Sequence, residues 1–109
     1  MNIEFKSLQV EEVPLHLFDA REQRKAVLDL ISHCGKQKDL FKARKLHSDI
    51  AAAHRTLVKD LYVSTALIRM YSRCNSIREA EDTFKSLVIR SVVSWNALIC
   101  SYVELRLFE

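Results

Sequence analysis

The sequence predicts an all-α protein built from repeated helical hairpins, and two observations carry this prediction. The stretch Ala66-Leu67-Ile68-Arg69-Met70-Tyr71 returns thirty-one residues later as Ala97-Leu98-Ile99-Cys100-Ser101-Tyr102. A motif that recurs with a period between about 20 and 50 residues is typical of a repeat array. The 109 residues include only one glycine and one proline, so long helices are favoured and a strand-and-turn architecture is disfavoured.

A second, fainter register divides the chain further. Leu30 and Ile31 precede Leu67 and Ile68 by thirty-seven residues, and other apolar positions follow the same shift. The organisation that follows is a lead segment over 1–23, a long repeat over 24–60, a short repeat over 61–91 and a partial repeat over 92–109.

Caps and periodicity place the helices. Asp19 with Glu22, and Ser76 with Glu79, have the spacing of a capping box, and Asp39 is a further N-cap. With the apolar stripes, these signals predict helices over 20–34, 40–53, 62–73, 77–87 and 93–104.

The connections and the end of the chain follow from the same pattern. Asn75 ends the third helix, because asparagine tolerates the left-handed conformation, and residues 54–59 form a polar connection. Residues 107–109 match the first turn of a further helix, so we expect a fragment, a truncated gene product or one piece of a longer array. With only two complete repeats, we expect marginal stability and exposed apolar residues at Leu105, Leu107 and Phe108.

Two aromatic positions have a structural interpretation that competes with a functional one. Trp95 lies on the expected buried stripe of the fifth helix with Leu98, Ile99 and Tyr102, so we assign it to the core rather than to base stacking. His47 takes the register position of a phenylalanine in the next repeat, which predicts a packed core residue.

Composition limits the classes of function. The net charge is +3, and residues 21–60 carry ten Lys/Arg against five Asp/Glu, which suits a polyanionic partner without requiring one. No apolar run approaches the length of a membrane span, and no targeting peptide is evident in the acidic first twenty residues. The three cysteines have no zinc spacing, so we predict small core residues, no metal and no cofactor.

Three stretches carry a resemblance to a known family. They are Ser94-Trp95-Asn96-Ala97-Leu98-Ile99, the run 66–80 with its Ala-Leu-Ile-x-Met-Tyr core, and Cys34-Gly35-Lys36 leading to 43–47. Together they resemble pentatricopeptide repeat proteins. The unequal repeat lengths resemble the plant-type PLS subclass, in which long, short and standard repeats alternate.

The resemblance implies a right-handed α-solenoid of antiparallel helix-turn-helix repeats. Its first helices would line a concave groove for single-stranded RNA, with one base per repeat read by two side chains. It would act without catalysis and without a small-molecule substrate, in the mitochondrion or chloroplast.

Site residues are implied by matching positions to the family. The base-reading residues would be Thr65, which resembles the purine-favouring class, Ser91, which departs from the usual Asn or Asp, and Asn96, which resembles the pyrimidine class. Tyr62 and Val93 match the position that packs against the base plane. Without the resemblance, Thr65 and Asn96 are helix N-terminal residues that satisfy backbone donors.

Other positions match the family's backbone contacts or depart from its readers. Lys36 and Arg73 match a position that faces the RNA backbone, whereas Glu104 at the equivalent place would repel a phosphate. The long repeat offers Leu28 and Asp60 as its pair, and because Leu28 cannot hydrogen-bond a base, this repeat is interpreted as a spacer.

Two functions from different classes remain open at this point. The first is a sequence-selective single-stranded RNA adaptor in organellar RNA processing, such as the choice of cytidine-to-uridine editing sites with RNA-editing factors. The second is a helical-repeat scaffold for protein partners. Trp95 and Leu98 have the spacing of the tetratricopeptide pattern, but Ile99 stands where that pattern has glycine. No zinc-deaminase signature or phosphate-binding glycine loop is present, so no enzyme is predicted.

Overall fold

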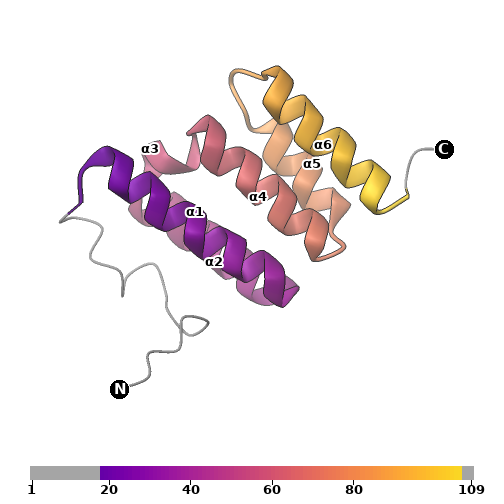
Figure 1. Cartoon of the computed structure of the whole chain (residues 1–109), viewed down its shortest axis with the longest axis horizontal. Helices are drawn as coiled ribbons and strands as arrows, with labels where there is room; N and C mark the ends of the chain where they lie inside the picture. The colour runs from indigo at the N-terminus through magenta and orange to yellow at the C-terminus, as the bar shows by residue number, and fades with distance from the viewer. Residues whose placement is uncertain (1–17, 107–109) are drawn as a thin grey trace.

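The computed structural model describes residues 18–106, and every regular element in that range is a helix. In chain order the helices are α1 (Ala20–Gln37), α2 (Leu40–Ala53), α3 (Arg55–Val58), α4 (Leu61–Arg73), α5 (Ile77–Lys85) and α6 (Val92–Glu104) (Figure 1). The predicted all-α helical-repeat solenoid is confirmed. Most of the predicted lead segment, the predicted helical turn at 107–109 and the predicted exposure of Leu107 and Phe108 lie outside the described residues. Leu105, also predicted to be exposed, is half-buried.

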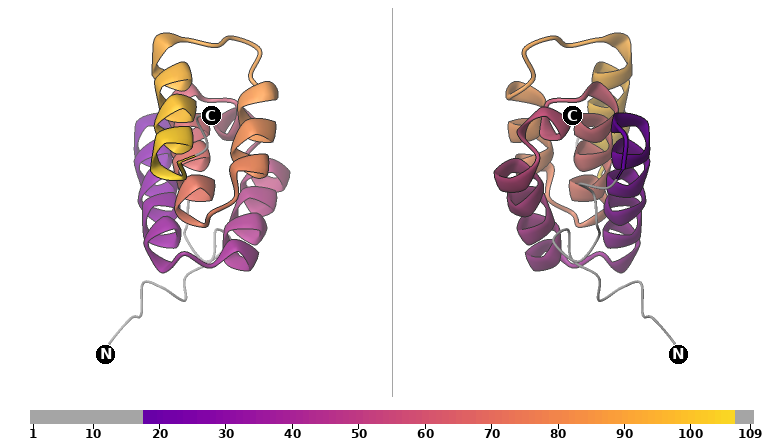
Figure 2. Two further views of the ribbon diagram at one scale, coloured as in Figure 1. Left: turned by 90° about the vertical axis from the view of Figure 1, so that its right-hand side faces the viewer. Right: turned by 90° about the vertical axis from the view of Figure 1, so that its left-hand side faces the viewer.

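The helices lie in two layers. α1, α4 and α6 are side by side in one layer, and α2, α3 and α5 form the other, as Figure 2 shows. Helix α4 holds the arrangement together, because it contacts α1 and α6 within its layer and packs against α5 of the other layer.

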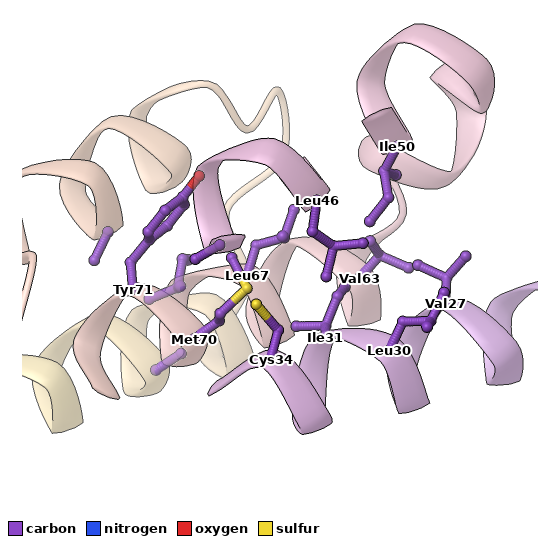
Figure 3. Close-up of a cluster of buried hydrophobic side chains, with 14 of the residues drawn as sticks. Val27, Leu30, Ile31, Cys34, Leu46, Ile50, Val63, Leu67, Met70 and Tyr71 are labelled. Atoms are coloured by element: carbon purple, nitrogen blue, oxygen red, sulfur yellow. The ribbon is translucent and has the colours of Figure 1, made fainter. Parts of the chain in front are cut away.

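A single apolar core lies between the layers and centres on α4 (Figure 3). Its largest fully buried side chains come from α1, α2 and α4 and are Val27, Ile31, Ile50, Val63, Leu67, Ile68 and Met70. Each aliphatic side chain of this size contributes about 1.5–3 kcal/mol when it leaves water. The core therefore joins the first repeat to the second, rather than stabilising each hairpin alone.

Three aspartates begin helices by accepting backbone hydrogen bonds. Asp19 and Glu22 form the predicted capping box, with a distance of 2.8 Å from the Glu22 nitrogen to Asp19 Oδ1. Asp39 accepts from the Lys42 nitrogen at 3.2 Å, as predicted. Asp60 caps α4 by accepting from the Tyr62 and Val63 nitrogens at 2.8 and 3.2 Å.

The predicted capping box at the start of α5 is wrong. The Ser76 side chain makes no hydrogen bond to the helix backbone, and its hydroxyl instead donates to Glu79 Oε1 at 2.9 Å. Glu79 is drawn away from the cap because it also accepts two hydrogen bonds from Arg44, at 2.6 and 2.7 Å. The ion pair between Arg44 of α2 and Glu79 of α5 therefore replaces the capping box that the local sequence predicts.

Several helix ends differ from the prediction. Asn75 has φ of 61° and ends the α4 region as predicted, but α1 runs on to Gln37 and is followed by Lys38 in the left-handed region with φ of 55°. Helix α5 stops at Lys85 rather than at residue 87. The predicted polar connection over 54–59 contains the short helix α3, in which the side chain of Leu57 is buried.

The predicted burial of α6 is partly wrong. Trp95 is 49% exposed and Ile99 is also exposed, although Leu98 is buried as predicted. The Trp95 ring packs edge-on against Phe84, with centroids 4.6 Å apart. Cys100 is exposed as well, contrary to the prediction of a core thiol. Helix α6 is apolar on most sides, so its sequence pattern cannot indicate which side faces α4.

A polar network joins the two repeats on the inner side of the second layer. His47 Nδ1 lies 2.6 Å from the Tyr71 hydroxyl, and Arg44 of α2 pairs with Glu79 of α5. Burial lowers the pKa of His47 and raises the pKa of Tyr71. The predicted core position of His47 is confirmed only in part, because the side chain packs against Tyr71 but is half-buried and lines an open pocket.

Because the pKa of His47 is lower in the folded chain than in the unfolded chain, the unfolded state takes up the proton first. The free energy of unfolding should therefore fall as the pH drops from about 6.5 towards the folded pKa. The double variant His47→Phe with Tyr71→Phe removes both polar partners and should flatten this dependence. Urea denaturation at about pH 7.5 and pH 5.5 measures it; an equal loss in the variant and the parent would show that His47 is not responsible.

The outer side of α6 predicts self-association. Val92, Trp95, Ile99 and Val103 are all exposed and recur at helical spacing, and such a continuous apolar patch is a known cause of association. Replacing Ile99 and Val103 by Lys and Glu should shift sedimentation at high concentration towards the monomer without changing the circular dichroism spectrum. Unchanged sedimentation would exclude this face as the cause.

Candidate nucleic-acid interface

The first-helix layer places the predicted base-contacting residues at equivalent heights on neighbouring helices. Tyr62 and Thr65 lie near the start of α4, and Val93 and Asn96 lie near the start of α6. Since α4 and α6 pack side by side (Figure 1), the two sets are adjacent in space. This is the arrangement that a strand crossing the helices one nucleotide per repeat requires.

The two predicted readers differ in their hydrogen-bonding state. Thr65 is 8% exposed, and its hydroxyl donates to the Leu61 carbonyl at 2.8 Å. Its proton is therefore in use, and only the acceptor lone pairs of Thr65 remain. Asn96 is exposed, and within residues 18–106 its side chain makes no hydrogen bond, so both its donor and its acceptor are available.

Ser91 is occupied by local structure. It is the N-cap of α6, where its hydroxyl accepts from the Ser94 nitrogen at 3.4 Å and its own nitrogen donates to Ser94 Oγ at 2.9 Å. Contact with a base would compete with this cap. Ser91 therefore has a structural role that the prediction did not include.

The base-packing positions are both accessible, and one of them has a partner that the sequence analysis missed. Tyr62 is 57% exposed and Val93 is also exposed. The Arg24 guanidinium lies over the Tyr62 ring, 5.1 Å from its centroid, and Arg24 Nε donates to Asp60 Oδ2 at 3.1 Å. Asp60, interpreted as half of a silent reader pair, therefore both caps α4 and holds Arg24 in place.

The signal for Arg24 was present in the sequence but ambiguous. Arg24 is one of several cations in the first turns of α1, and helical periodicity alone does not say which of them faces α4. The ion pair with Asp60, which forms only in the folded chain, shows that Arg24 is a cation of α1 that faces α4.

The predicted backbone-contacting cations lie on α1 and α4, and the structure separates them. Arg73 lines a pocket of about 180 Å³ between α1 and α4, together with Arg69, which the sequence analysis did not select. Lys36 is exposed and is not among the residues that line this pocket. At the equivalent end of α6, Glu104 accepts a hydrogen bond from Ser72 Oγ at 3.1 Å.

A larger and mainly apolar pocket lies between the second-helix layer and the start of α4. It has a volume of about 550 Å³. Its lining comes from α2, α3, the first residue of α4, α5 and the segment before α6, and includes Ala51, Val58, Leu61, Leu87, Val88, Ile89 and the predicted base-reading residue Ser91. It contains none of the residues of the first-helix layer's cationic pocket.

The described residues offer little for catalysis. In residues 18–106 no group of three or more His, Cys, Asp or Glu side chains is placed to hold a metal ion. Burial, which is the largest cause, raises the pKa of the Cys34 thiol to about 11, so this thiol is not a nucleophile at neutral pH. None of the helices described here is long and apolar enough to cross a bilayer.

Comparison with known proteins gives a consistent result. The PPR repeat family matches residues 62–92 and 93–109. A pentatricopeptide repeat-containing protein of Arabidopsis thaliana is 36% identical over 75 residues, which is 69% of this chain and 10% of that protein. A second from the same plant, named as mitochondrial, is 36% identical over 75 residues, or 69% of this chain and 7% of its own length. A third, also named as mitochondrial, is 44% identical over 45 residues, or 41% of this chain and 8% of its own length.

The chain spans about a tenth of the length of the curated relatives it matches. No solved structure matches it. The boundary between the two matched repeats falls at residue 92, where α6 begins. The repeat matches and the relatives together support the assignment of the chain to the pentatricopeptide repeat proteins.

Proposed function

We propose that the chain is part of a sequence-selective single-stranded RNA-binding adaptor that acts in organellar RNA processing, such as the choice of cytidine-to-uridine editing sites. The observation that carries the proposal is the first-helix layer, where Thr65 and Asn96 occupy equivalent positions on adjacent helices beside the exposed Tyr62 and Val93. The names of two relatives as mitochondrial support an organellar site.

The available hydrogen-bonding groups fit the proposed base preferences. Thr65 retains only acceptor capacity, since its proton goes to Leu61, so it pairs with an amino or imino donor on the edge of a purine. Asn96 offers a donor and an acceptor and can pair with either polarity on a pyrimidine edge. The cap uses one acceptor lone pair of the Ser91 hydroxyl, so Ser91 would contribute as a second reader through its O–H donor and its other lone pair.

The role proposed is recognition, and the chemistry is assigned to a partner. A modifying enzyme or RNA-editing factor would act on the RNA that the repeats hold. The long repeat, with Leu28 at its reader position, would separate this unit from the next reader. The alternation of repeat lengths is what favours the PLS subclass.

A second candidate function is a scaffold for protein partners. The observation in its favour is the apolar pocket of about 550 Å³, whose rim includes the highly exposed Val88 and Ile89. Apolar grooves of this kind accept peptide side chains. This function would use mainly the second-helix layer, although Leu61 of α4 and Ser91, the N-cap of α6, also line the pocket.

Two readers make a weak RNA site, which sets the expected affinity of the chain. Stacking and edge contacts contribute on the order of 1–3 kcal/mol per nucleotide, and part of this is lost in ordering the strand. We expect binding of short single-stranded RNA no tighter than the high micromolar range, measurable by NMR titration. Absence of any RNA binding, with capture of peptides by the apolar pocket, would favour the scaffold.

Substitution of Thr65 tests base reading directly. In a complete repeat array that contains this unit, Thr65→Asn adds a donor and should move the preference at one nucleotide from purine towards pyrimidine. Neighbouring nucleotides should be unaffected, and binding to a library of randomised RNA measures both. Equal weakening for all sequences would mean that Thr65 is a structural residue of α4.

A further inference from the structure

The turn before α2 and the first half of α2 are strongly basic. The charged side chains of residues 36–45 are Lys36, Lys38, Asp39, Lys42, Arg44 and Lys45. All five cations are exposed, whereas Asp39 is half-buried and caps α2. Positive charge therefore gathers on the surface of this part of the chain, apart from the cations that line the pocket between α1 and α4.

Phe41 lies among these cations and is 77% exposed. The opposite side of the helix packs on the core through its buried residues Ala43, Leu46 and Ile50. A single exposed apolar side chain is ordinary on a protein surface, but this one has cations on both sides. Arg44 and Lys45 follow Phe41 at the spacing of neighbours on a helix, and Lys38 lies in the preceding turn. We call Lys38, Phe41, Lys42, Arg44 and Lys45 the α2 patch.

The charge of the α2 patch is only partly compensated. Arg44 pairs with Glu79, and Lys45 Nζ lies 3.1 Å from Asp49 Oδ2. Ion pairs between exposed side chains are weak and are screened by salt, so these two cations remain open to another anion. The other two cations of the patch form no ion pair within residues 18–106.

The shape of the α2 patch decides which anionic partner it suits. None of its residues lines either of the two pockets described above, and Phe41 projects from the outer side of a helix. Peptides and small ligands take concave sites, and single-stranded nucleic acid takes a groove with successive aromatic side chains. A lipid surface needs no groove, because it accepts an apolar side chain at the acyl boundary and attracts lysine and arginine to anionic headgroups.

The α2 patch faces away from the candidate nucleic-acid interface. Helix α2 lies in the second layer, whereas Tyr62, Thr65 and Asn96 lie on α4 and α6 of the first layer (Figure 2). The core lies between the layers, and Phe41 is on the side of α2 opposite its buried residues. One chain can therefore contact RNA and a second anionic surface at the same time.

We propose that the α2 patch is a peripheral contact site for anionic lipid bilayers, with Phe41 inserted at the boundary between headgroups and acyl chains and the surrounding cations beside lipid phosphates. The inference goes beyond the proposed function, because it uses a layer that the proposed RNA contacts do not use. It needs no membrane-spanning helix, since a surface contact buries only one side of α2. One apolar side chain and four cations give weak and reversible binding, so the patch holds the chain near a membrane without anchoring it.

The test is flotation of the whole chain with lipid vesicles, because aggregates of the chain do not float. The chain should bind vesicles of phosphatidylcholine mixed with phosphatidylglycerol and should not bind vesicles of phosphatidylcholine alone. The double variant Lys38→Gln with Lys42→Gln should lower the partition coefficient on mixed vesicles roughly thirtyfold, about fivefold for each lysine near an anionic surface. Phe41→Ala should lower it roughly tenfold and leave its salt dependence unchanged, since the removed contact carries no charge.

Matched controls remove the same kinds of group from exposed positions outside the patch. Lys25→Gln with Lys59→Gln removes two positive charges, and Ile99→Ala removes apolar surface from an exposed side chain of α6. Each control should change the partition coefficient by less than about twofold, because salt screens distant exposed charges and α6 does not face the bilayer. Circular dichroism should be the same for every variant, since all the substituted side chains are exposed.

Several results would overturn the proposal. No binding to mixed vesicles, or an equal loss in the charge control, would show that the patch is not a lipid contact. Unchanged binding by Phe41→Ala would show that no side chain is inserted. These three results leave the proposed RNA function untouched, because its residues lie on the other layer.

Two competition results would assign the α2 patch to a different partner. Displacement from vesicles by single-stranded RNA, with the same loss of RNA affinity in the lysine variant, would make the patch a nucleic-acid surface. Displacement by polyglutamate at equal charge would make it a surface for an acidic protein. The lipid assignment predicts that neither polymer displaces the chain at the salt concentration of the flotation experiment.

Discussion

The packing of α4 against neighbours on three sides is the constraint on which the rest of the structure depends. Its buried residues Leu67, Ile68 and Met70 join α1, α5 and α6 in one core. Loss of one such side chain typically costs about 2–5 kcal/mol, a large part of the roughly 5–15 kcal/mol that stabilises a small domain. Because three sides are occupied, only the remaining side of α4 can contact a ligand.

That remaining side carries the residues assigned to RNA. Tyr62 is exposed near the start of α4, and Arg73 is exposed towards its end. Between them, Thr65 is nearly buried and bonded to its own helix. Asp60 connects α1 to the start of α4, because the same carboxylate caps α4 and pairs with Arg24 of the preceding repeat. The proposed roles of these residues in base packing, base reading and phosphate contact therefore all depend on how α4 is packed.

Much of this fold follows from local signals in the sequence. Aspartate caps at Asp19 and Asp39, and a left-handed Asn75, lie where short-range chemistry places them. The repeat register also identified Thr65 and Asn96 as equivalent positions, which the adjacent α4 and α6 confirm as a geometric statement. Their role in base reading is a proposal.

What the sequence could not predict depends on contacts between repeats. Glu79 leaves its cap because Arg44 from another hairpin binds it, and Arg24 is selected by Asp60, thirty-six residues away in the chain. Trp95 was assigned to the core because α6 is apolar on most sides, so only the position of α5 decides that its ring lies half exposed against Phe84. Arg69 and Arg73 share a pocket beside Gly35 only because α1 packs closely against α4, which helical periodicity alone does not predict.

The central claim is that the first-helix layer is the binding surface and the second-helix layer is its support. Amide hydrogen exchange of the chain, with and without single-stranded RNA, tests it most directly, because exchange reports local opening residue by residue. We predict added protection at the start of α4 and α6 and at the α1–α4 junction, with α2 and α5 unchanged. Protection confined to α3, α5 and the segment around Val88 and Ile89 would contradict the account.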